Sequence, residues 1–186
     1  MRGASAAKAL LQSLSGGDRR SIGESNRVVS AVLERPVLMT VLVQGVESDD
    51  PVLRMRCADA MEKVTASRPE LLVPYKKTLL RKLSAIEQKE VRWHVAPMLA
   101  RLPLSEREEA RVLDLLLSYT NDPSSIVKTM AMQALADLAK RNPRLRPEVM
   151  QDIEELMATG TPAMKARGRK LLWRMALEIP TARKER

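Results

Sequence analysis

Apolar residues along this chain recur at intervals of three and four positions, which is the spacing of one face of an α-helix. Two clear runs are Leu79, Leu80 and Leu83, and Leu113, Leu116 and Leu117. No stretch alternates apolar and polar residues as a half-buried strand would. The pattern therefore predicts an all-α protein.

The helical pattern also repeats. In four stretches a base follows an apolar residue, and large apolar residues stand seven and ten positions after that base. The stretches are "VLRMRCADAMEKV" from Val52, "EVRWHVAPMLARL" from Glu90, "IVKTMAMQALADL" from Ile126 and "AMKARGRKLLWRM" from Ala163. The aligned bases are Arg54, Arg92, Lys128 and Lys165, at intervals of 38, 36 and 37 residues. This interval suits a repeat of two helices. We expect the bases to form a structural ladder, pairing with acids such as Asp50, Glu90 or Asp122.

Proline and capping residues divide the repeats into helices. A side chain that can cap a helix, followed by proline, occurs at Asp50-Pro51, Asp122-Pro123 and Thr161-Pro162 and predicts the start of a first helix. Second helices are expected to begin near Pro36, Pro69, Ser105 and Pro147. Ser105 and Glu108 have the spacing of a capping box. Each repeat should thus be a pair of antiparallel helices.

Two of these stretches, "DDPVLRMRCADAMEKV" and "DPSSIVKTMAMQALADL", resemble the first helix of HEAT repeats. The segment "GDRRSIG", residues 17–23, is also similar to the start of bacterial HEAT-repeat proteins of uncharacterised role. The resemblance covers about residues 22–177. It implies an α-α superhelix, a HEAT/armadillo-like right-handed solenoid of about four helical hairpins plus a terminal half repeat. It implies little about function, because such arrays hold many unrelated partners.

A single helical hairpin cannot bury its apolar face alone, so neighbouring hairpins are expected to stack into one domain. We expect a flexible leader or fraying helix over residues 1–20, a single HEAT-repeat domain over 21–177 and a polar tail over 178–186. The expected repeats are residues 20–48, 49–86, 87–121 and 122–160, with a half repeat at 161–177.

Candidate catalytic chemistry is sparse. The single histidine, His94, aligns with Arg56, Met130 and Arg167 in the other repeats, so its position tolerates unrelated side chains. One histidine and one cysteine, Cys57, offer neither a zinc cluster nor a catalytic triad, and Gly-x-Ser-x-Gly is absent from the sequence. We expect no enzymatic activity, cofactor or metal. No run of 18 apolar residues suggests a membrane span, and the lone cysteine suits a reducing cytoplasm.

Charge indicates where a partner could bind. Lys and Arg outnumber Asp and Glu by 32 to 23, for a net charge of +9. Four bases and a tyrosine on the second helix of the second repeat form one candidate surface, and five bases near the end form the other. The first holds Tyr75, Lys76, Lys77, Arg81 and Lys82, and the second holds Lys165, Arg167, Arg169, Lys170 and Arg174. The second surface has two interpretations, a polar cap on the array or an anion contact.

These observations favour a non-enzymatic, monomeric scaffold or adaptor that holds an acidic protein partner on the concave surface formed by second helices. The alternative is non-specific binding to nucleic-acid phosphates through the basic patches. A HEAT-like DNA glycosylase is a more distant third hypothesis. The sequence departs from the glycosylase pattern because neither Trp93 nor Trp173 is followed one turn later by an acid, and four aromatic residues give few stacking platforms.

Overall fold

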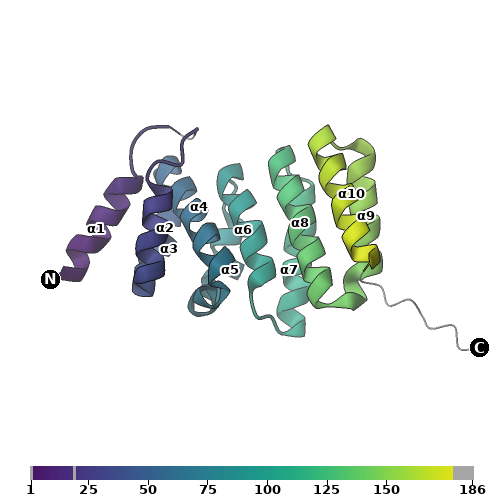
Figure 1. The fold of residues 1–186 in the computed structure, drawn as a ribbon, viewed down its shortest axis with the longest axis horizontal. Helices are drawn as coiled ribbons and strands as arrows, with labels where there is room; N and C mark the ends of the chain where they lie inside the picture. The colour runs from purple at the N-terminus through teal and green to yellow at the C-terminus, as the bar shows by residue number, and fades with distance from the viewer. Residues whose placement is uncertain (1, 19, 178–186) are drawn as a thin grey trace, which may run out of the picture. The chain divides into compact units, whose positions relative to one another are not determined.

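The computed structural model describes residues 2–18 and 20–177, with side chains from residue 7 onward. Every regular element in this part of the chain is a helix, which confirms the prediction of an all-α protein (Figure 1). The chain forms two compact units, Met1–Val112 and Leu113–Arg186. The boundary between these units lies within the helix that starts at Glu106, inside the range 21–177 for which a single repeat domain is expected.

The first unit contains α1 (Arg2–Leu14), α2 (Ser25–Glu34), η1 (Pro36–Leu38), α3 (Met39–Val46), α4 (Pro51–Ser67), η2 (Pro69–Tyr75), α5 (Lys76–Arg81), η3 (Leu83–Ala85) and α6 (Lys89–Arg101), where η marks a 3-10 helix. Helix α7 (Glu106–Thr120) begins in the first unit and ends in the second. The second unit continues with α8 (Ser125–Arg141), η4 (Pro143–Leu145), α9 (Arg146–Thr159) and α10 (Pro162–Leu177).

Helix starts follow the capping residues closely, with one exception. The Asp50 carboxylate accepts a hydrogen bond from the Val52 N–H at 2.9 Å and caps α4, as predicted. At the start of α8 the prediction is wrong by two residues. Ser124 caps that helix, because the Asp122 carboxylate instead accepts the Ser124 N–H at 2.8 Å in a turn before it.

Three first helices end in the same way. Arg35, Arg68 and Asn142 leave the helical conformation with φ of −132°, −134° and −121°, and a proline follows each of them. Proline disfavours helical geometry at the residue before it. In all three places that proline opens a short 3-10 turn that leads into the second helix.

Helix α4 is the centre of the first unit, where it packs against α2, α3 and α6. Its Met61 and Val64 are fully buried. The segment expected to be a leader or fraying helix contains α1, which packs against α3 and α4 and buries Leu10 and Leu14. Burial of two leucines stabilises α1 by about 1.5–3 kcal/mol each relative to exposure.

The second unit is built from α8, α9 and α10, which pack against one another pairwise. Leu135 on α8 and Ile153 on α9 are fully buried, and Leu171 on α10 is nearly so. Gly168 lets α10 approach α9, because a Cβ at this position would lie 2.3 Å from Met157 Sδ.

Polar contacts within each unit join residues about 35 positions apart. On α4, Arg54 Nε donates to Gln88 Oε1 at 2.8 Å, and on α10, Arg167 Nη1 donates to Gln133 Oε1 at 2.9 Å; both pairs are 34 residues apart. The prediction of an acidic partner for Arg54 is wrong, because its other hydrogen bond goes to the Ser48 carbonyl at 3.2 Å. These separations are close to the interval between the aligned bases.

Candidate functional site

Tyr75 ends η2, a 3-10 segment that begins with one proline and contains another, Pro74. Proline fixes its own backbone and removes a donor, which favours this short irregular turn over an α-helix. The Tyr75 hydroxyl lies 2.6 Å from the Thr40 hydroxyl on α3. Tyr75 therefore joins two second helices of the first unit.

Lys76 joins α5 to the start of α7. Its ammonium group donates to Glu108 Oε2 at 2.8 Å and to the Pro103 carbonyl at 3.0 Å. The same carboxylate accepts the Ser105 N–H at 2.9 Å, and the Glu108 N–H is 3.4 Å from the Ser105 hydroxyl, so the predicted capping box is confirmed. The hydrogen bonds from Lys76 and then Ser105 lower the pKa of Glu108 to about 2. Lys76 is thus engaged in the fold.

Lys82, at the other end of α5, is also paired. Its Nζ lies 3.2 Å from Glu47 Oε2, and both side chains are exposed. A pair in this setting contributes about 0–1 kcal/mol, because water screens it. Glu47 therefore neutralises Lys82 locally without anchoring it firmly.

Lys77 and Arg81 differ from their neighbours. Both side chains are exposed, and among the described residues neither has a hydrogen-bond or ion-pair partner. Because they are four positions apart, they share one face of α5. Two like charges at this spacing destabilise a helix by roughly 0.2–0.5 kcal/mol. These two cations are therefore exposed and available to a partner outside the fold.

A similar pair on α7 was not predicted as part of the site. Arg107 and Arg111 are exposed and also four positions apart. The contact of Lys76 with Glu108 places the start of α7 beside α5. The sequence "EREEARVL" contains both arginines at this spacing. Residues 87–121 nevertheless hold five bases and six acids, and their net charge of −1 gave no sign of a basic surface. We call Lys77, Arg81, Arg107 and Arg111 the second-helix basic surface.

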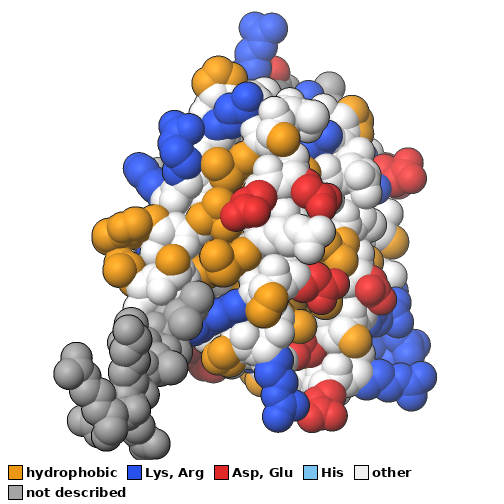
Figure 2. Space-filling view, turned by 90° about the vertical axis from the view of Figure 1, so that its right-hand side faces the viewer, with side chains coloured by type: hydrophobic (Ala, Val, Ile, Leu, Met, Phe, Trp, Pro, Cys, Tyr) orange, Lys and Arg blue, Asp and Glu red, His pale blue; other side chains and the backbone are white. Residues whose placement is uncertain are grey.

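The five terminal candidates all lie on α10, but they are distributed around it. Arg167, Lys170 and Arg174 share one side by their spacing, whereas Lys165 and Arg169 lie on another. Trp173, with a relative exposure of 65%, lies between the two groups. Figure 2 views this end of the molecule and shows exposed hydrophobic side chains between a group of Lys and Arg and a group of Asp and Glu. The terminal cluster is therefore not one continuous basic face.

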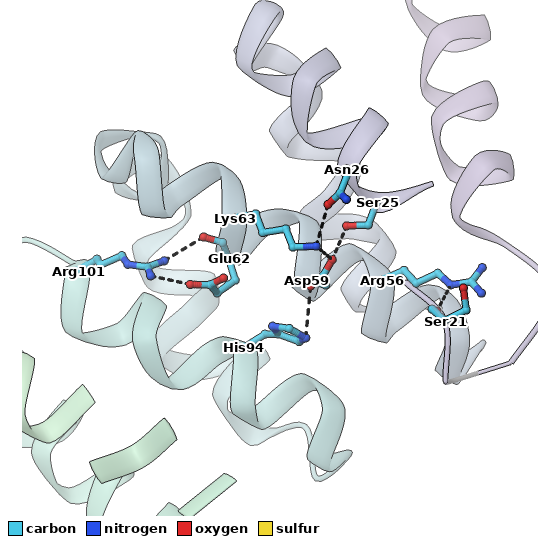
Figure 3. A network of polar contacts seen from close by, with 9 residues as sticks. All are labelled: Ser21, Ser25, Asn26, Arg56, Asp59, Glu62, Lys63, His94 and Arg101. Atoms are coloured by element: carbon cyan, nitrogen blue, oxygen red, sulfur yellow. Dashed lines mark hydrogen bonds and ion pairs between the residues drawn. The ribbon is translucent and has the colours of Figure 1, made fainter. Parts of the chain in front are cut away.

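His94 belongs to a polar network that links first helices (Figure 3). Asp59 on α4 is nearly buried, accepts hydrogen bonds from Ser25 and Lys63, and lies 3.9 Å from His94 Nε2 on α6. Burial lowers the pKa of His94 and outweighs the opposing effects of the Asp59 and Glu62 carboxylates. His94 is therefore mainly neutral at pH 7 and connects α6 to α4.

Arg56 holds the segment between α1 and α2. Its guanidinium, in a residue with 4% exposure, donates to the carbonyls of Leu14, Gly16, Asp18 and Ser21 at 2.7–3.2 Å. Figure 3 shows the side chain directed toward Ser21. Glycine is needed where the backbone passes closest, because a Cβ at Gly23, which has φ of 54°, would lie 2.9 Å from Arg56 Cζ. The aligned position had indicated no such role for Arg56.

The described residues hold no group of three His, Cys, Asp or Glu side chains that could bind a metal ion. Burial, and then the nearby Asp50 charge, raise the pKa of Cys57 to about 12, so its thiol is protonated at neutral pH. Within the described ranges, no helix is long and apolar enough to cross a bilayer.

A scan against protein-family models found no match for this chain, and a search of curated proteins found no significant relative. The class that the structure defines is an all-α protein with two compact helical units.

Proposed function

We propose that this protein is a non-enzymatic scaffold that binds an acidic protein partner through the second-helix basic surface. We propose further that its helices form a HEAT-like solenoid of about four hairpins, and that it acts as a monomer in the cytoplasm. Three features support the repeat: the intervals of 36 to 38 residues between aligned bases, the polar contacts about 35 positions apart, and the recurring turn before proline.

One observation supports the binding role above others. Lys77 and Arg81 have no partner among the described residues, although the flanking Lys76 and Lys82 are both paired with glutamates. Like charges at this spacing are slightly unfavourable within the helix, and an acidic partner would neutralise them. Arg107 and Arg111 add two exposed cations on α7, whose start contacts α5 through Lys76 and Glu108.

The spacing of these cations defines the chemistry of the partner. Residues four positions apart on a helix are about 6 Å apart along its axis. Glutamates or aspartates at similar intervals on a partner would each meet one cation. Because such groups remain partly solvated, the surface should act mainly on the association rate and on partner choice, with a strong dependence on salt.

Phosphates of a nucleic acid would meet the same cations, so the test must separate the two classes of partner. The decisive variant is Lys77→Glu with Arg81→Glu. The control is Lys170→Glu with Arg174→Glu, an exposed pair at the same spacing on α10 with an identical change in charge. Both variants and the native protein serve as bait in an extract of the source cell, and bound proteins are quantified by mass spectrometry.

We expect an acidic protein to be recovered by the native chain and the control but not by Lys77→Glu/Arg81→Glu. Recovery of the same protein by all three baits would refute the site. In parallel, a labelled DNA duplex is titrated at about 50 and 200 mM salt, because a protein that neutralises several phosphates loses orders of magnitude in affinity over that range. Tight binding that weakens in this way would favour the nucleic-acid alternative.

A further inference from the structure

A groove of about 360 Å³ runs between α1 and α2 of the first unit. Its floor is apolar and is formed by Leu10 from α1, Val28 and Ala31 from α2, and Leu38 from η1. Clefts of 300–1,000 Å³ with a mostly apolar lining are typical of binding sites for small ligands. The groove lies on helices that the second-helix basic surface does not use.

The groove exists because α1 lies apart from α2. Helix α3 packs along α4, and α9 packs along α10, so the following first helix is covered in both cases. Helix α1 instead packs against α3 and α4 and less closely against α2. Ala31 and Leu38 are therefore left partly exposed along this channel, next to Leu10 and Val28, which are nearly buried.

Both walls of the groove are held without an occupant. The Arg56 guanidinium fixes the carbonyls of Leu14 and Gly16 at the end of α1, at 3.0 and 2.7 Å. On the other wall, Ser25 at the start of α2 donates to the nearly buried Asp59 carboxylate on α4. A site whose walls are already fixed loses less conformational entropy when it binds a partner.

The packing elsewhere in the molecule indicates which shape fits. Helix α4 packs against the earlier first helix α2, and α10 packs against the earlier first helix α8. Helix α2 has no earlier first helix among the described residues, and the groove lies beside it. The space therefore suits another helix, with apolar residues at i, i+3 or i+4, and i+7 directed onto the floor.

The charge at the rim indicates the composition of that helix. Arg27 in the first turn of α2 and Arg35, the first residue after this helix, line the groove near its two ends, roughly two turns apart. The Arg27 side chain is 82% exposed, and its ion pair with Glu24 is long, with 3.9 Å between Nη1 and Oε2. The side chain of Arg35 has no partner among the residues described. Glu34 is the one acid in the lining. Acids on the bound helix would complement the two arginines, whereas the basic α10 of a second copy would be repelled.

We propose that the α1–α2 groove binds an amphipathic helix of a partner protein, with its apolar stripe on Leu10, Val28, Ala31 and Leu38 and with acids two turns apart paired to Arg27 and Arg35. This site is independent of the second-helix basic surface. It gives the protein a second, sequence-selective contact in addition to a charge-driven one.

The test selects binders of the full chain from a displayed library of random 16-residue peptides. Enriched peptides should carry an apolar stripe at helical spacing and acids about eight positions apart. Their affinity, measured by fluorescence anisotropy, should fall at least tenfold for Arg27→Glu/Arg35→Glu. It should fall similarly for Ala31→Trp, which fills the groove. The Lys77→Glu/Arg81→Glu protein should bind these peptides as the native chain does.

Circular dichroism melts check that each variant is folded. If Ala31→Trp does not fold, Arg27→Glu/Arg35→Glu still tests the proposal. Three results would overturn the proposal. Selection could yield no helical binders, it could yield peptides with basic flanks, or the enriched peptides could bind Arg27→Glu/Arg35→Glu as tightly as the native protein. Self-association of the native chain that Ala31→Trp abolishes would also overturn it, because the occupant would then be a second copy.

Discussion

Replacing Arg56 with methionine should weaken the attachment of α1 to the first unit while leaving the rest folded. Four hydrogen bonds from a charged donor contribute about 2 kcal/mol each, and burial of an unpaired guanidinium costs about 5 kcal/mol after relaxation. The net stabilisation is then about 3 kcal/mol. Methionine keeps the aliphatic bulk of the side chain but donates to none of the four carbonyls.

Hydrogen exchange followed by mass spectrometry reports this change locally. A loss of about 3 kcal/mol in the free energy of opening corresponds to roughly 100-fold faster exchange. We expect that acceleration in peptides from α1 and from the segment that joins it to α2. Peptides from α8 and α10, in the second unit, should exchange at their native rates.

The matched control is Arg54→Met, which removes an arginine from the same helix. Arg54 bonds to Gln88 and to the Ser48 carbonyl, so its loss should affect the α4–α6 region and leave α1 protected. If α1 exchanges at the native rate in Arg56→Met, the guanidinium does not hold this segment and the estimate is refuted. Equal acceleration across both units would also refute it, because the effect would then be global.

Three further results are expected. Because burial lowers the pKa of His94, the native protein should lose stability as the pH falls below about 6.5, where the unfolded histidine takes up a proton that the folded one does not. Urea melts at several pH values should show a smaller loss of stability for His94→Gln. The prediction is contradicted if the free energy of unfolding depends on pH equally in the variant and the native protein. Cys57, with its pKa raised to about 12, should react with iodoacetamide at pH 7.5 only after unfolding, and rapid labelling of the native chain would show otherwise. Gly45→Ala should destabilise the protein by about 1–3 kcal/mol, because the new Cβ would lie 2.3 Å from Cys57 Sγ. In thermal melts, adding Cys57→Ala to the same chain should restore part of that loss. If the destabilisations of the two single variants simply add in the double variant, the clash is excluded.

The helical class and most helix boundaries could be predicted because their signals are local. The Asp50 cap and the Ser105–Glu108 capping box depend on residues within one turn, and both are present. The start of α8 was misplaced because Asp122 and Ser124 are both competent caps, and only the turn between them decides which one is used. The relative positions of helices depend on contacts between distant residues, which local signals do not contain.

The residues of the candidate site could be predicted from the sequence, but not which of its basic side chains form ion pairs within the fold. The sequence identified five residues around α5, but it could not distinguish the engaged Lys76 from the exposed Lys77, because the partner, Glu108, lies 32 positions away. Arg56 was missed for a related reason. Its partners are backbone carbonyls between α1 and α2, and a carbonyl has no residue-specific signature in a sequence.

Photo-crosslinking tests the central proposal most directly. A photoreactive amino acid replaces Val73, which is 48% exposed and lies one turn before Lys77, and the irradiated complex is digested and sequenced. The proposal predicts a crosslinked protein segment rich in Asp and Glu, lost when Lys77→Glu and Arg81→Glu are added. A crosslink to nucleic acid or to a neutral or basic segment, or one that persists in the double variant, would contradict it.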